Sequence, residues 1–408
     1  MSRVLLVTTN FWPEPSGSAP YATDLIKILN EKVYDVTVLT GLPHYPWWRI
    51  PDEFLKYGPG VTNYDGVIVT RVRHYIPRRV NIFSRMLYEL SFIFSFARQF
   101  KYLQKLDFDL VISIGSSLSA GLSGRSIAKN LGIPFGVIVH DLVGKGVKQS
   151  GLSGGFVISR LVNFLERKVL KSAKSIVAVS DEMCQSIEAL KIERAKITLN
   201  LIYAVNKIEL FEKKSARKFF GWDENRFTII HTGNIGSKQD LANIVRAADL
   251  LINYKNIDFY IIGHGNQEIR MKKLCEGKSN IRIMPAVTQF EYSLLLSSAD
   301  LLIVNERSTQ TEMSLPSKLT SYLFSERPVI AAVPRDGATW KFLDGIAELV
   351  EAGNPKALAD SIIKLQNDSA KMEKLAKDGL AFAKANLEPS VGRAKYLEWV
   401  KKLLSTTV

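Results

Sequence analysis

The sequence predicts two α/β domains, each built on a mostly parallel sheet, and three observations lead to this prediction. Short apolar runs alternate with amphipathic stretches at helical spacing, which is typical of strands buried on both faces and separated by helices. The alternation runs through residues 1–200 and restarts at residue 227. The length of 408 residues exceeds what one hydrophobic core usually supports. We therefore expect two Rossmann-like halves.

The first domain is predicted over residues 1–200. Its strands should be apolar runs of three to five residues, rich in Val and Ile. We expect them at Val4–Val7, Val36–Leu39, Val67–Val69, Leu110–Ile114, Phe135–Val139 and Ile176–Val179. The helices between them are expected at Tyr21–Asn30, Ile82–Leu103, Ala120–Asn130 and Ile158–Lys171.

The second domain is predicted over residues 201–388, with a charged linker around residues 200–225. Its strands are expected at Phe227–His231, Phe259–Ile262, Ile281–Met284, Leu301–Val304, Pro328–Ala332 and Glu348–Val350. Its helices are expected at Leu241–Asn253, Glu268–Glu276, Gln289–Ser298, Ser317–Ser325 and Lys356–Gln366. A third segment, residues 389–408, contains a predicted helix at Pro389–Leu404.

Composition excludes several classes of protein. With 46% hydrophobic and 23% charged residues, the chain is neither disordered nor of low complexity. Two cysteines, Cys184 and Cys275, are too few for a disulfide scaffold, and they match no zinc spacing. The first residues read as a strand rather than a signal peptide, and no run reaches the roughly 18 apolar residues of a membrane span. We expect a cytoplasmic protein.

Ligands of open α/β sheets bind beyond the carboxyl ends of the strands, so the loops there are the candidate sites. In the first domain, Gly17 and Ser18 follow the first strand and precede a helix, where free N–H groups favour oxyanions. An ordinary turn between a strand and a helix is the alternative. His140 and Asp141 follow the strand Phe135–Val139, where they could contact substrate or transfer a proton.

The second domain offers a stronger candidate. Gly233, Gly236 and Lys238 follow its first strand and precede a predicted helix, an arrangement that suits a diphosphate. A solvated lysine in the first helical turn is the alternative interpretation. After the strand Leu301–Val304, a long polar loop contains Arg307 and ends at Ser317-Lys318, where Ser317 resembles an N-cap.

One acidic motif has the spacing of a metal site, but its position argues against metal binding. Asp107-Phe108-Asp109 has the Asp-x-Asp spacing of metal-dependent sugar transferases. It precedes a predicted strand instead of following one, so it falls at the wrong end of the sheet. We predict no metal site and no cofactor.

Taken together, these segments resemble the GT-B glycosyltransferases of the large retaining family 4, over essentially the whole chain. The resemblance is closest to the bacterial exopolysaccharide, colanic-acid and O-antigen branch. It is carried by Pro13–Ala19, Thr40–Pro46, His140–Leu142, Thr232–Leu241 and Pro316–Tyr322, followed by Arg327–Ala331.

The resemblance implies the GT-B architecture, in which two Rossmann-like domains face a cleft and a C-terminal helix packs back on the N-terminal domain. It implies transfer of a sugar, with retention and without a metal, from a nucleoside-diphosphate sugar to a glycan acceptor. In this branch the acceptor is expected to be lipid-linked and the product a surface polysaccharide. The N-terminal domain would bind the acceptor and the C-terminal domain the donor.

The resemblance also assigns the donor phosphates to Lys238. The arginine that usually accompanies this lysine would fall at Asn234, so its charge is missing. We expect Lys318 or Arg307 to replace it. In the first domain, His140 would position the sugar and Gly17 would contact the phosphate side.

The paired glutamates of the family, spaced E-x7-E, would fall at Met313 and Ser321. Neither residue is acidic. Glu312 could serve in place of the first glutamate, and Ser321 could bind a ribose hydroxyl. The backbone from Met284 to Val287 would contact the nucleotide base of the donor.

Charge is concentrated in the first 200 residues, which hold 25 Lys and Arg against 16 Asp and Glu, within a net charge of +14. Arg78 and Arg79 lead into an aromatic-rich helix that contains Arg85, Arg98 and Lys101. Basic residues mixed with aromatics suit an anionic membrane surface, so we expect peripheral attachment to the inner face of the cell membrane. The alternative is that the aromatic side chains of this helix belong to the hydrophobic core and the basic side chains form an ordinary solvated surface. No nucleic-acid-binding motif is present.

Two other functions remain open at this point. An epimerase would act on the nucleotide sugar without an acceptor, but the sequence has few carboxylates at the expected site. A non-catalytic sugar-nucleotide-binding protein would explain the missing E-x7-E glutamates.

Overall fold

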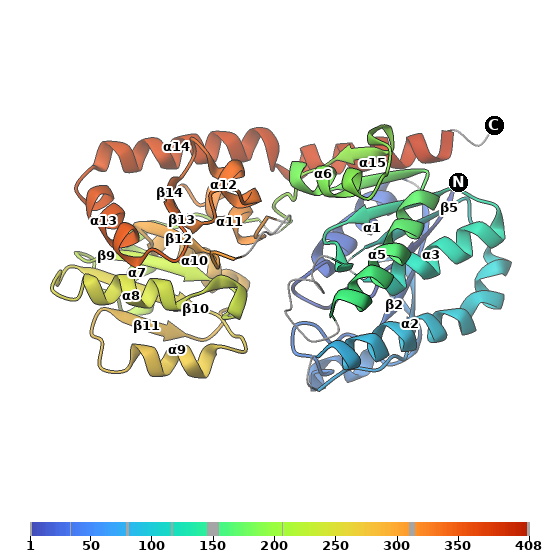
Figure 1. The fold of residues 1–408 in the computed structure, drawn as a ribbon, viewed down its shortest axis with the longest axis horizontal. Helices are drawn as coiled ribbons and strands as arrows, with labels where there is room; N and C mark the ends of the chain where they lie inside the picture. The colour runs from blue at the N-terminus through green and yellow to red at the C-terminus, as the bar shows by residue number, and fades with distance from the viewer. Residues whose placement is uncertain are drawn as a thin grey trace. The chain divides into compact units, whose positions relative to one another are not determined.

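A computed structural model describes residues 2–32, 34–78, 81–115, 117–144, 155–205, 207–309 and 315–405. The chain forms two compact units (Figure 1). Unit 1 comprises Met1–Leu201 and Gly392–Val408, and unit 2 comprises Ile202–Val391. Both are α/β units with a mostly parallel sheet, as the sequence predicts.

Unit 1 is built on an eight-stranded sheet in the order β3-β4-β2-β1-β5-β6-β7-β8. The central strands are buried along their whole length because the sheet is covered on both faces. The strands are β1 (Arg3–Val7), β2 (Asp35–Gly41), β3 (Gly60–Tyr64), β4 (Val67–Val72), β5 (Leu110–Ile114), β6 (Phe135–Val139), β7 (Ser175–Ala178) and β8 (Ile197–Leu199).

The helices of unit 1 connect these strands. They are α1 (Ala19–Glu31), α2 (Ile82–Leu103), α3 (Leu118–Leu131), α5 (Gly155–Ser172) and α6 (Asp181–Ala189). Three of the helix starts follow the usual capping chemistry. Asn81 and Ser84 form a reciprocal capping box at α2, and Ser117 and Ser180 each accept a backbone N–H at α3 and α6.

The last helix, α15 (Pro389–Ser405), returns the chain to unit 1, as expected. Its inner face buries Tyr396, Trp399, Val400 and Leu403. The indole of Trp399 lies over Gly136 in β6, where a Cβ atom would fall 2.7 Å from the ring, and its Nε1–H donates to Ser175 Oγ at 2.9 Å. Asn200 Nδ2 donates to the carbonyl of Gly392 at 3.0 Å. The helix is therefore an integral part of unit 1.

Unit 2 has a six-stranded parallel sheet in the order β11-β10-β9-β12-β13-β14. The strands are β9 (Phe227–Thr232), β10 (Ile257–Ile262), β11 (Ile281–Met284), β12 (Leu301–Asn305), β13 (Val329–Val333) and β14 (Glu348–Glu351). The helices are α7 (Lys213–Phe220), α8 (Ala242–Leu250), α9 (Glu268–Cys275), α10 (Gln289–Ser298), α11 (Lys318–Phe324), α12 (Ala338–Leu343), α13 (Pro355–Gln366) and α14 (Ser369–Asn386).

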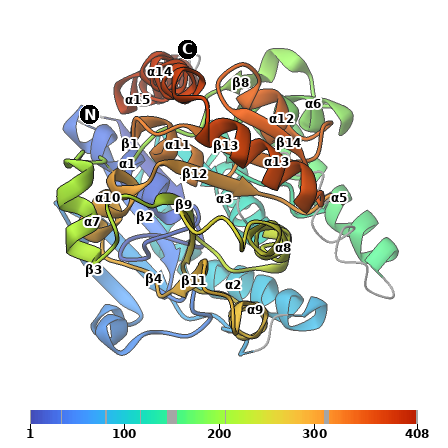
Figure 2. The same ribbon diagram turned by 90° about the vertical axis from the view of Figure 1, so that its left-hand side faces the viewer.

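Figure 2 shows α7 and α10 on one side of these strands and α8, α9 and α13 on the other. The second side holds one continuous core, in which residues from β9, β10 and β12 such as Ile229, Phe259 and Ile303 meet Leu251 and Leu358. All five side chains are almost fully buried. The rigid sheet holds the carboxyl ends of β9, β10 and β12 side by side, and this edge carries the candidate donor site.

Several details differ from the sequence-based expectation. The strands β3 and β8 were not predicted, and β3 pairs antiparallel to β4 at the sheet edge. The helices α6, α7 and α12 and the 18-residue helix α14 were also missed. Helix α8 begins at Ala242, after a 3₁₀ turn at Ser237–Gln239 and a left-handed Asp240. Within the described ranges, no helix is both long and apolar enough to cross a membrane.

Candidate functional site

The first candidate loop in unit 1 follows β1. Gly17 has a positive φ of 69°, and a Cβ atom there would lie 3.1 Å from the ring of Tyr45. A side chain at position 17 would be strained and would press on this ring. Ser18 is buried at the start of α1 without capping the helix. The loop backbone is therefore held closely against the loop after β2.

Glu14 ties these two loops together, and the sequence analysis did not select it. The carboxylate is buried, and its Oε1 accepts hydrogen bonds from the backbone N–H groups of His44 (2.7 Å) and Tyr45 (2.8 Å). Asn10 Nδ2 donates to Oε2 at 2.8 Å. Burial raises the pKa of Glu14 to about 7, against the opposing effect of these hydrogen bonds. The only sequence signal is an acidic residue between two prolines at a strand end.

His140 and Asp141 lie directly after β6, as the sequence predicts for a strand-end pair. Asp141 is exposed, whereas the ring of His140 is partly covered and meets Tyr21 edge-on at 5.3 Å. Burial lowers the pKa of His140 to about 4. The imidazole is therefore neutral near pH 7. It can hydrogen-bond to a sugar hydroxyl, but it carries no positive charge at that pH.

In unit 2, glycines allow the loops after β9 and β10 to pack against each other at the carboxyl edge of the sheet. Gly233 has φ 115° and Gly263 has φ 148°, and a Cβ atom on Gly263 would lie 1.8 Å from the carbonyl oxygen of Gly233. A Cβ atom on Gly265 would fall 2.3 Å from the carbonyl oxygen of Ile235. The GxG sequence after β10 therefore has a structural reason: it makes room for the loop after β9.

Predicted cationic residues meet at this edge. The backbone N–H of Arg307 donates to the carbonyl of Lys238 at 2.9 Å, which joins the loop after β12 to the loop after β9. Asn305 Nδ2 reinforces the junction by donating to the carbonyls of Gln239 (2.7 Å) and Asp240 (3.1 Å). The side chains of Lys238 and Arg307 are both exposed. The structure thus brings two of the predicted phosphate-binding residues onto one rim.

Lys318 reaches the same edge from the first turn of α11. Its ammonium lies 3.1 Å from Nε2 of His231, and a Cβ atom on Gly233 would be 3.3 Å from Lys318 Nζ. Burial lowers the pKa of Lys318 to about 7, while the nearby carboxylate of Glu306 acts to raise it. Glu306 is itself buried and accepts a hydrogen bond from Thr339 Oγ1 at 2.6 Å. Sequence reasoning missed both His231 and Glu306.

The other predicted residues are distributed around this edge. Asn234 is exposed in the loop after β9, and its amide lies close to Gly236. Ser321 lies one turn into α11 and hydrogen-bonds to Tyr292, so its hydroxyl already has a partner. Met284 ends β11, and its carbonyl accepts the N–H of Gly263 at 3.0 Å. Val287 lies half-buried before α10. Glu312 and Met313 lie outside the described residues.

Of two local expectations, one holds and one is wrong. Lys238 precedes a helix, as predicted, but it lies in the 3₁₀ turn before α8, so the helix dipole does not act on it directly. Ser317 occupies the N-cap position of α11, but its hydroxyl caps no backbone N–H. The positive character of this edge therefore comes mainly from side-chain cations rather than from capped helix ends.

The Asp-x-Asp motif lies at the opposite end of the sheet in unit 1. Asp109 immediately precedes β5, and its carboxylate accepts the backbone N–H of Arg3 at 2.8 Å. Asp107 adopts a left-handed conformation at the end of a 3₁₀ turn. Among the described residues, no group of three or more His, Cys, Asp or Glu side chains could hold a metal ion. Metal independence stays a prediction.

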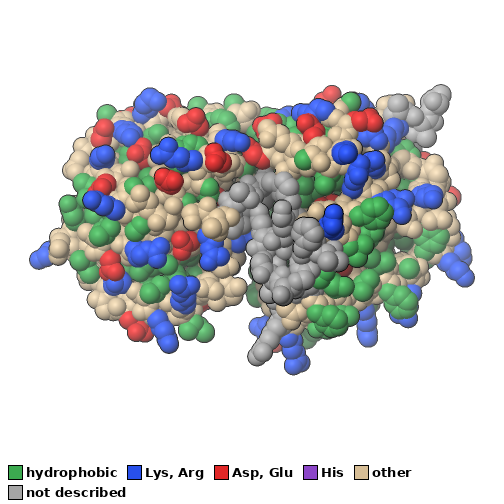
Figure 3. All heavy atoms as spheres, viewed as in Figure 1, with side chains coloured by type: hydrophobic (Ala, Val, Ile, Leu, Met, Phe, Trp, Pro, Cys, Tyr) green, Lys and Arg blue, Asp and Glu red, His purple; other side chains and the backbone are tan. Residues whose placement is uncertain are grey.

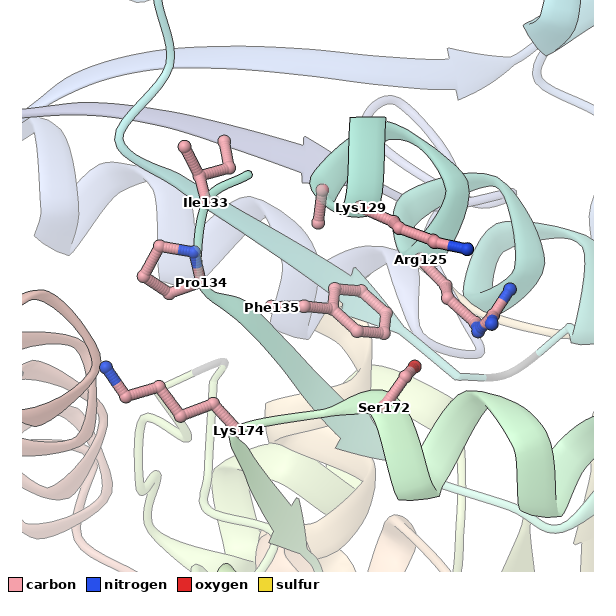
Figure 4. Close-up of a pocket in the computed structure, with 8 residues that line it drawn as sticks. Arg125, Lys129, Ile133, Pro134, Phe135, Ser172 and Lys174 are labelled. Atoms are coloured by element: carbon pink, nitrogen blue, oxygen red, sulfur yellow. The ribbon is translucent and has the colours of Figure 1, made fainter. Parts of the chain in front are cut away.

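A pocket in unit 1 lies away from the predicted residues, whereas a groove in unit 2 includes one of them, Met284. A pocket of about 330 Å³ at the amino end of β6 is lined by Arg125, Lys129, Phe135 and Lys174 (Figure 4). Two of its three cations have structural explanations, because Lys174 donates to the carbonyl of Leu403 and Lys129 lies in the last turn of α3. A groove of about 840 Å³ in unit 2 is lined by Trp222, Tyr260 and Arg282, among others.

Comparison with known families divides the chain where the structure does. Residues 16–200 match the glycosyl transferase 4-like domain, and residues 212–381 match the glycosyl transferases group 1. The first match carries Gly17 and His140, and the second carries Lys238, Arg307 and Lys318.

Individual proteins resemble the chain over nearly its full length. The chain is 26% identical over 380 residues to a putative colanic acid biosynthesis glycosyl transferase, WcaI, of Escherichia coli K12, covering 88% of this chain and 91% of the relative. Sucrose-phosphate synthase from Thermosynechococcus elongatus superimposes with a TM-score of 0.77 at 14% identity, covering 100% of both chains. Anabaena HepE, solved in complex with UDP-glucose, gives 0.70 at 12% identity and covers 98% of this chain and 100% of its own.

Proposed function

The chain is a glycosyltransferase of the GT-B fold, with a glycosyl transferase 4-like domain followed by a group 1 domain, and on this premise we propose that it moves a sugar from a nucleoside-diphosphate sugar to a lipid-linked glycan. The transfer retains the configuration at the anomeric carbon and serves surface polysaccharide synthesis. The similarity to the colanic acid protein supports the choice of pathway class.

The observation that carries the donor assignment is the cationic, glycine-lined edge of unit 2. Lys238 and Arg307 lie on one rim, and Lys318 lies against Gly233. Close backbone packing at Gly233 leaves room for a ligand oxygen where a side chain would otherwise project. Cations placed before the reaction begins stabilise the charge that develops on a leaving diphosphate. HepE, which shares the fold, was solved with UDP-glucose.

In the proposed reaction, the bond between the anomeric carbon and the diphosphate oxygen breaks, and its electron pair stays on the diphosphate. The acceptor hydroxyl oxygen bonds to the anomeric carbon on the same face. Its proton passes to the departing phosphate oxygen. Lys238, Arg307 and Lys318 balance the charge of the leaving group, and neutral His140 hydrogen-bonds to the sugar. No metal enters the scheme.

The acceptor assignment is supported by an exposed apolar face on α2. Phe83, Leu90 and Phe94 are 69%, 58% and 60% exposed, whereas Phe92 and Phe96 on the same helix are buried. Arg98 lies over the ring of Phe94 at 4.4 Å, and Lys101 is exposed nearby. In Figure 3, hydrophobic and basic side chains alternate on the face where α2 and α5 lie in Figure 1. Such a face suits the boundary of an anionic lipid bilayer.

Substrate turnover tests the proposal. A thermal-shift panel of nucleoside diphosphates identifies the base, and the matching nucleotide sugars are then incubated with a lipid-linked glycan extract. We expect the sugar to appear in the lipid fraction with free nucleoside diphosphate as the second product. Isomerised nucleotide sugar without transfer would identify an epimerase. Tight binding without any product would identify a binding protein.

Co-sedimentation with phosphatidylglycerol vesicles tests the membrane assignment. Arg85 is a poor probe, because its guanidinium lies over the rings of Trp48 and Tyr88, and Arg79 lies outside the described residues. Replacing Arg98 and Lys101 with Ser should release the protein at low salt, since each basic residue contributes about 1 kcal/mol near an anionic surface. A matched variant, Lys272→Ser with Lys273→Ser on α9, should sediment like the wild type. Equal sedimentation of both variants would contradict this assignment.

A further inference from the structure

His231 is a fully buried histidine whose protonation pattern is fixed by the main chain. It lies in β9, one residue before the strand ends, and its Nδ1 is 3.0 Å from the carbonyl oxygen of Ile303 in the neighbouring strand β12. A carbonyl only accepts, so Nδ1 carries the hydrogen and donates it. Nε2 therefore holds a lone pair and can only accept.

That lone pair faces Lys318. The Nζ atom of Lys318 is 3.1 Å from Nε2 of His231, so the ammonium donates one hydrogen bond to the imidazole. The same end of the side chain lies against the main chain of Gly233, where both Cε and Nζ would be 3.3 Å from a Cβ atom. His231 and Gly233 thus define the position of the ammonium from two sides.

We propose that His231 is a positioning residue for donor phosphate binding, because its Nε2 holds the ammonium of Lys318 at the first glycine of the loop after β9. This role rests on the proposed nucleotide-sugar donor and adds a residue that does not itself touch the ligand. Without this contact, the long side chain of Lys318 would adopt many rotamers, and binding a phosphate would cost the entropy of fixing one of them. Held by His231, it is already in place when the diphosphate arrives.

Among the described residues, few charged groups act on this pair. Glu306, after β12, is the carboxylate that acts to raise the pKa of Lys318, and burial outweighs it. The hydroxyls of Tyr292 on α10 and Tyr322 on α11 approach Thr232 and remain protonated, because burial raises their pKa values. Burial and the neighbouring Lys318 keep the pKa of His231 well below its ordinary value. The imidazole therefore stays neutral while Lys318 titrates.

This arrangement couples the binding of a nucleoside diphosphate to the protonation of Lys318. With a pKa of about 7, Lys318 is only partly protonated near neutrality in the free protein. A bound diphosphate favours the charged form and raises that pKa, so binding takes up a proton above pH 7. The contribution of Lys318 to affinity should be constant below pH 7 and should fall by up to about tenfold per pH unit above it.

Three substitutions separate this role from simple packing. In His231→Gln the side-chain oxygen can take the place of Nε2 as acceptor for Lys318. In His231→Asn the side-chain amide can still donate to Ile303, but nothing accepts from Lys318. We expect UDP affinity at pH 8, measured by calorimetry, to stay within about threefold for His231→Gln and to fall about tenfold or more for His231→Asn, as for loss of a charge-assisted hydrogen bond. Asn is also the smaller side chain, so packing alone would give the same order. His231→Leu fills the volume of His without any acceptor for Lys318, and we expect its UDP affinity to fall like that of His231→Asn. Wild-type UDP affinity in His231→Leu would overturn the proposal.

The pH profile supplies the second readout. Lys318→Arg keeps its charge at every pH, so its UDP affinity should lose the decline above pH 7, and subtracting its profile removes the titration of the nucleotide phosphates. A decline that survives in Lys318→Arg would refute the coupling.

A measurement without nucleotide keeps the two proposals distinguishable. Acetylation of Lys318, followed by mass spectrometry against pH, should show a midpoint near pH 7 in the wild type and a lower one in His231→Asn. If UDP and the other nucleoside diphosphates do not bind the wild type, the donor assignment fails, while this midpoint still reports on the pair. An unchanged midpoint in His231→Asn would refute the positioning role even if nucleotides bind.

Discussion

Replacing Trp399 with Ala should destabilise unit 1 substantially. The Trp399 side chain is only 2% exposed and lies over Gly136, with Leu403 beside it. The indole is too large for its neighbours to fill the space it leaves, and buried Trp-to-Ala changes typically cost about 3–5 kcal/mol. Ser175 adds little, because its hydroxyl still donates to the carbonyl of Lys196 at 3.2 Å. For a unit of this size, about 2–4 °C per kcal/mol gives a fall in Tm of roughly 6–20 °C.

Differential scanning calorimetry measures this fall, and a double-mutant cycle tests its cause. Gly136→Ala should cost about 1–3 kcal/mol in the wild type, because the new methyl collides with the indole. In the Trp399→Ala background the same methyl meets only the flexible end of Leu403, at 2.8 Å, so the two costs should not add. Trp47, 40% exposed in the same unit, supplies a control whose replacement by Ala should cost less than about 1 kcal/mol. Additive costs, or a fall equal to that of Trp47→Ala, would refute the reasoning.

Three further results are expected. Because the pKa of Glu14 is raised, its contribution to the free energy of unfolding falls as pH rises from 4.5 to about 7, by about 3 kcal/mol in total, and is constant above that. Urea unfolding at a series of pH values should show this fall in the wild type and not in Glu14→Gln. The same pH dependence in both proteins would contradict the raised pKa. Lys238→Ala should weaken nucleoside-diphosphate binding by about 1.5–3 kcal/mol in calorimetry, with unchanged affinity as the contrary result. Transfer should survive EDTA, and activity lost in EDTA and restored by manganese would overturn metal independence.

The strand pattern was readable from the sequence because the central strands are buried on both faces. Leu110–Ile114 and Phe135–Val139 coincide with β5 and β6, since short, mostly apolar runs rich in Val and Ile are typical of strands covered on both faces. The strand β3 reads Gly-Val-Thr-Asn-Tyr and lies at the edge with mostly exposed residues, so it has no such signal. The helix α14 has a weak apolar stripe of small residues and was missed for that reason.

The candidate site was partly predictable for a similar reason. Strand ends identified the loops of Gly17, His140, Gly233 and Lys238, because topology alone puts them at one edge of each sheet. His231 could not be found in this way. Its function depends on a carbonyl in β12 and on a lysine 87 positions away, and neither partner is visible from a single residue inside a strand. Glu14 was hidden likewise, since its partners are backbone N–H groups of another loop.

The return of the chain to unit 1 has a consequence for synthesis on the ribosome. Unit 2, Ile202–Val391, is inserted between the two parts of unit 1, so it is made completely before α15 exists. At about 5–20 residues per second, these residues take roughly 10–40 s to make. During that interval the nascent unit 1 exposes the apolar surface around Gly136 that Trp399 and Leu403 will cover. A chain that stops before Pro389 would keep this surface open permanently, and we expect chaperones and proteases to recognise it as unfinished.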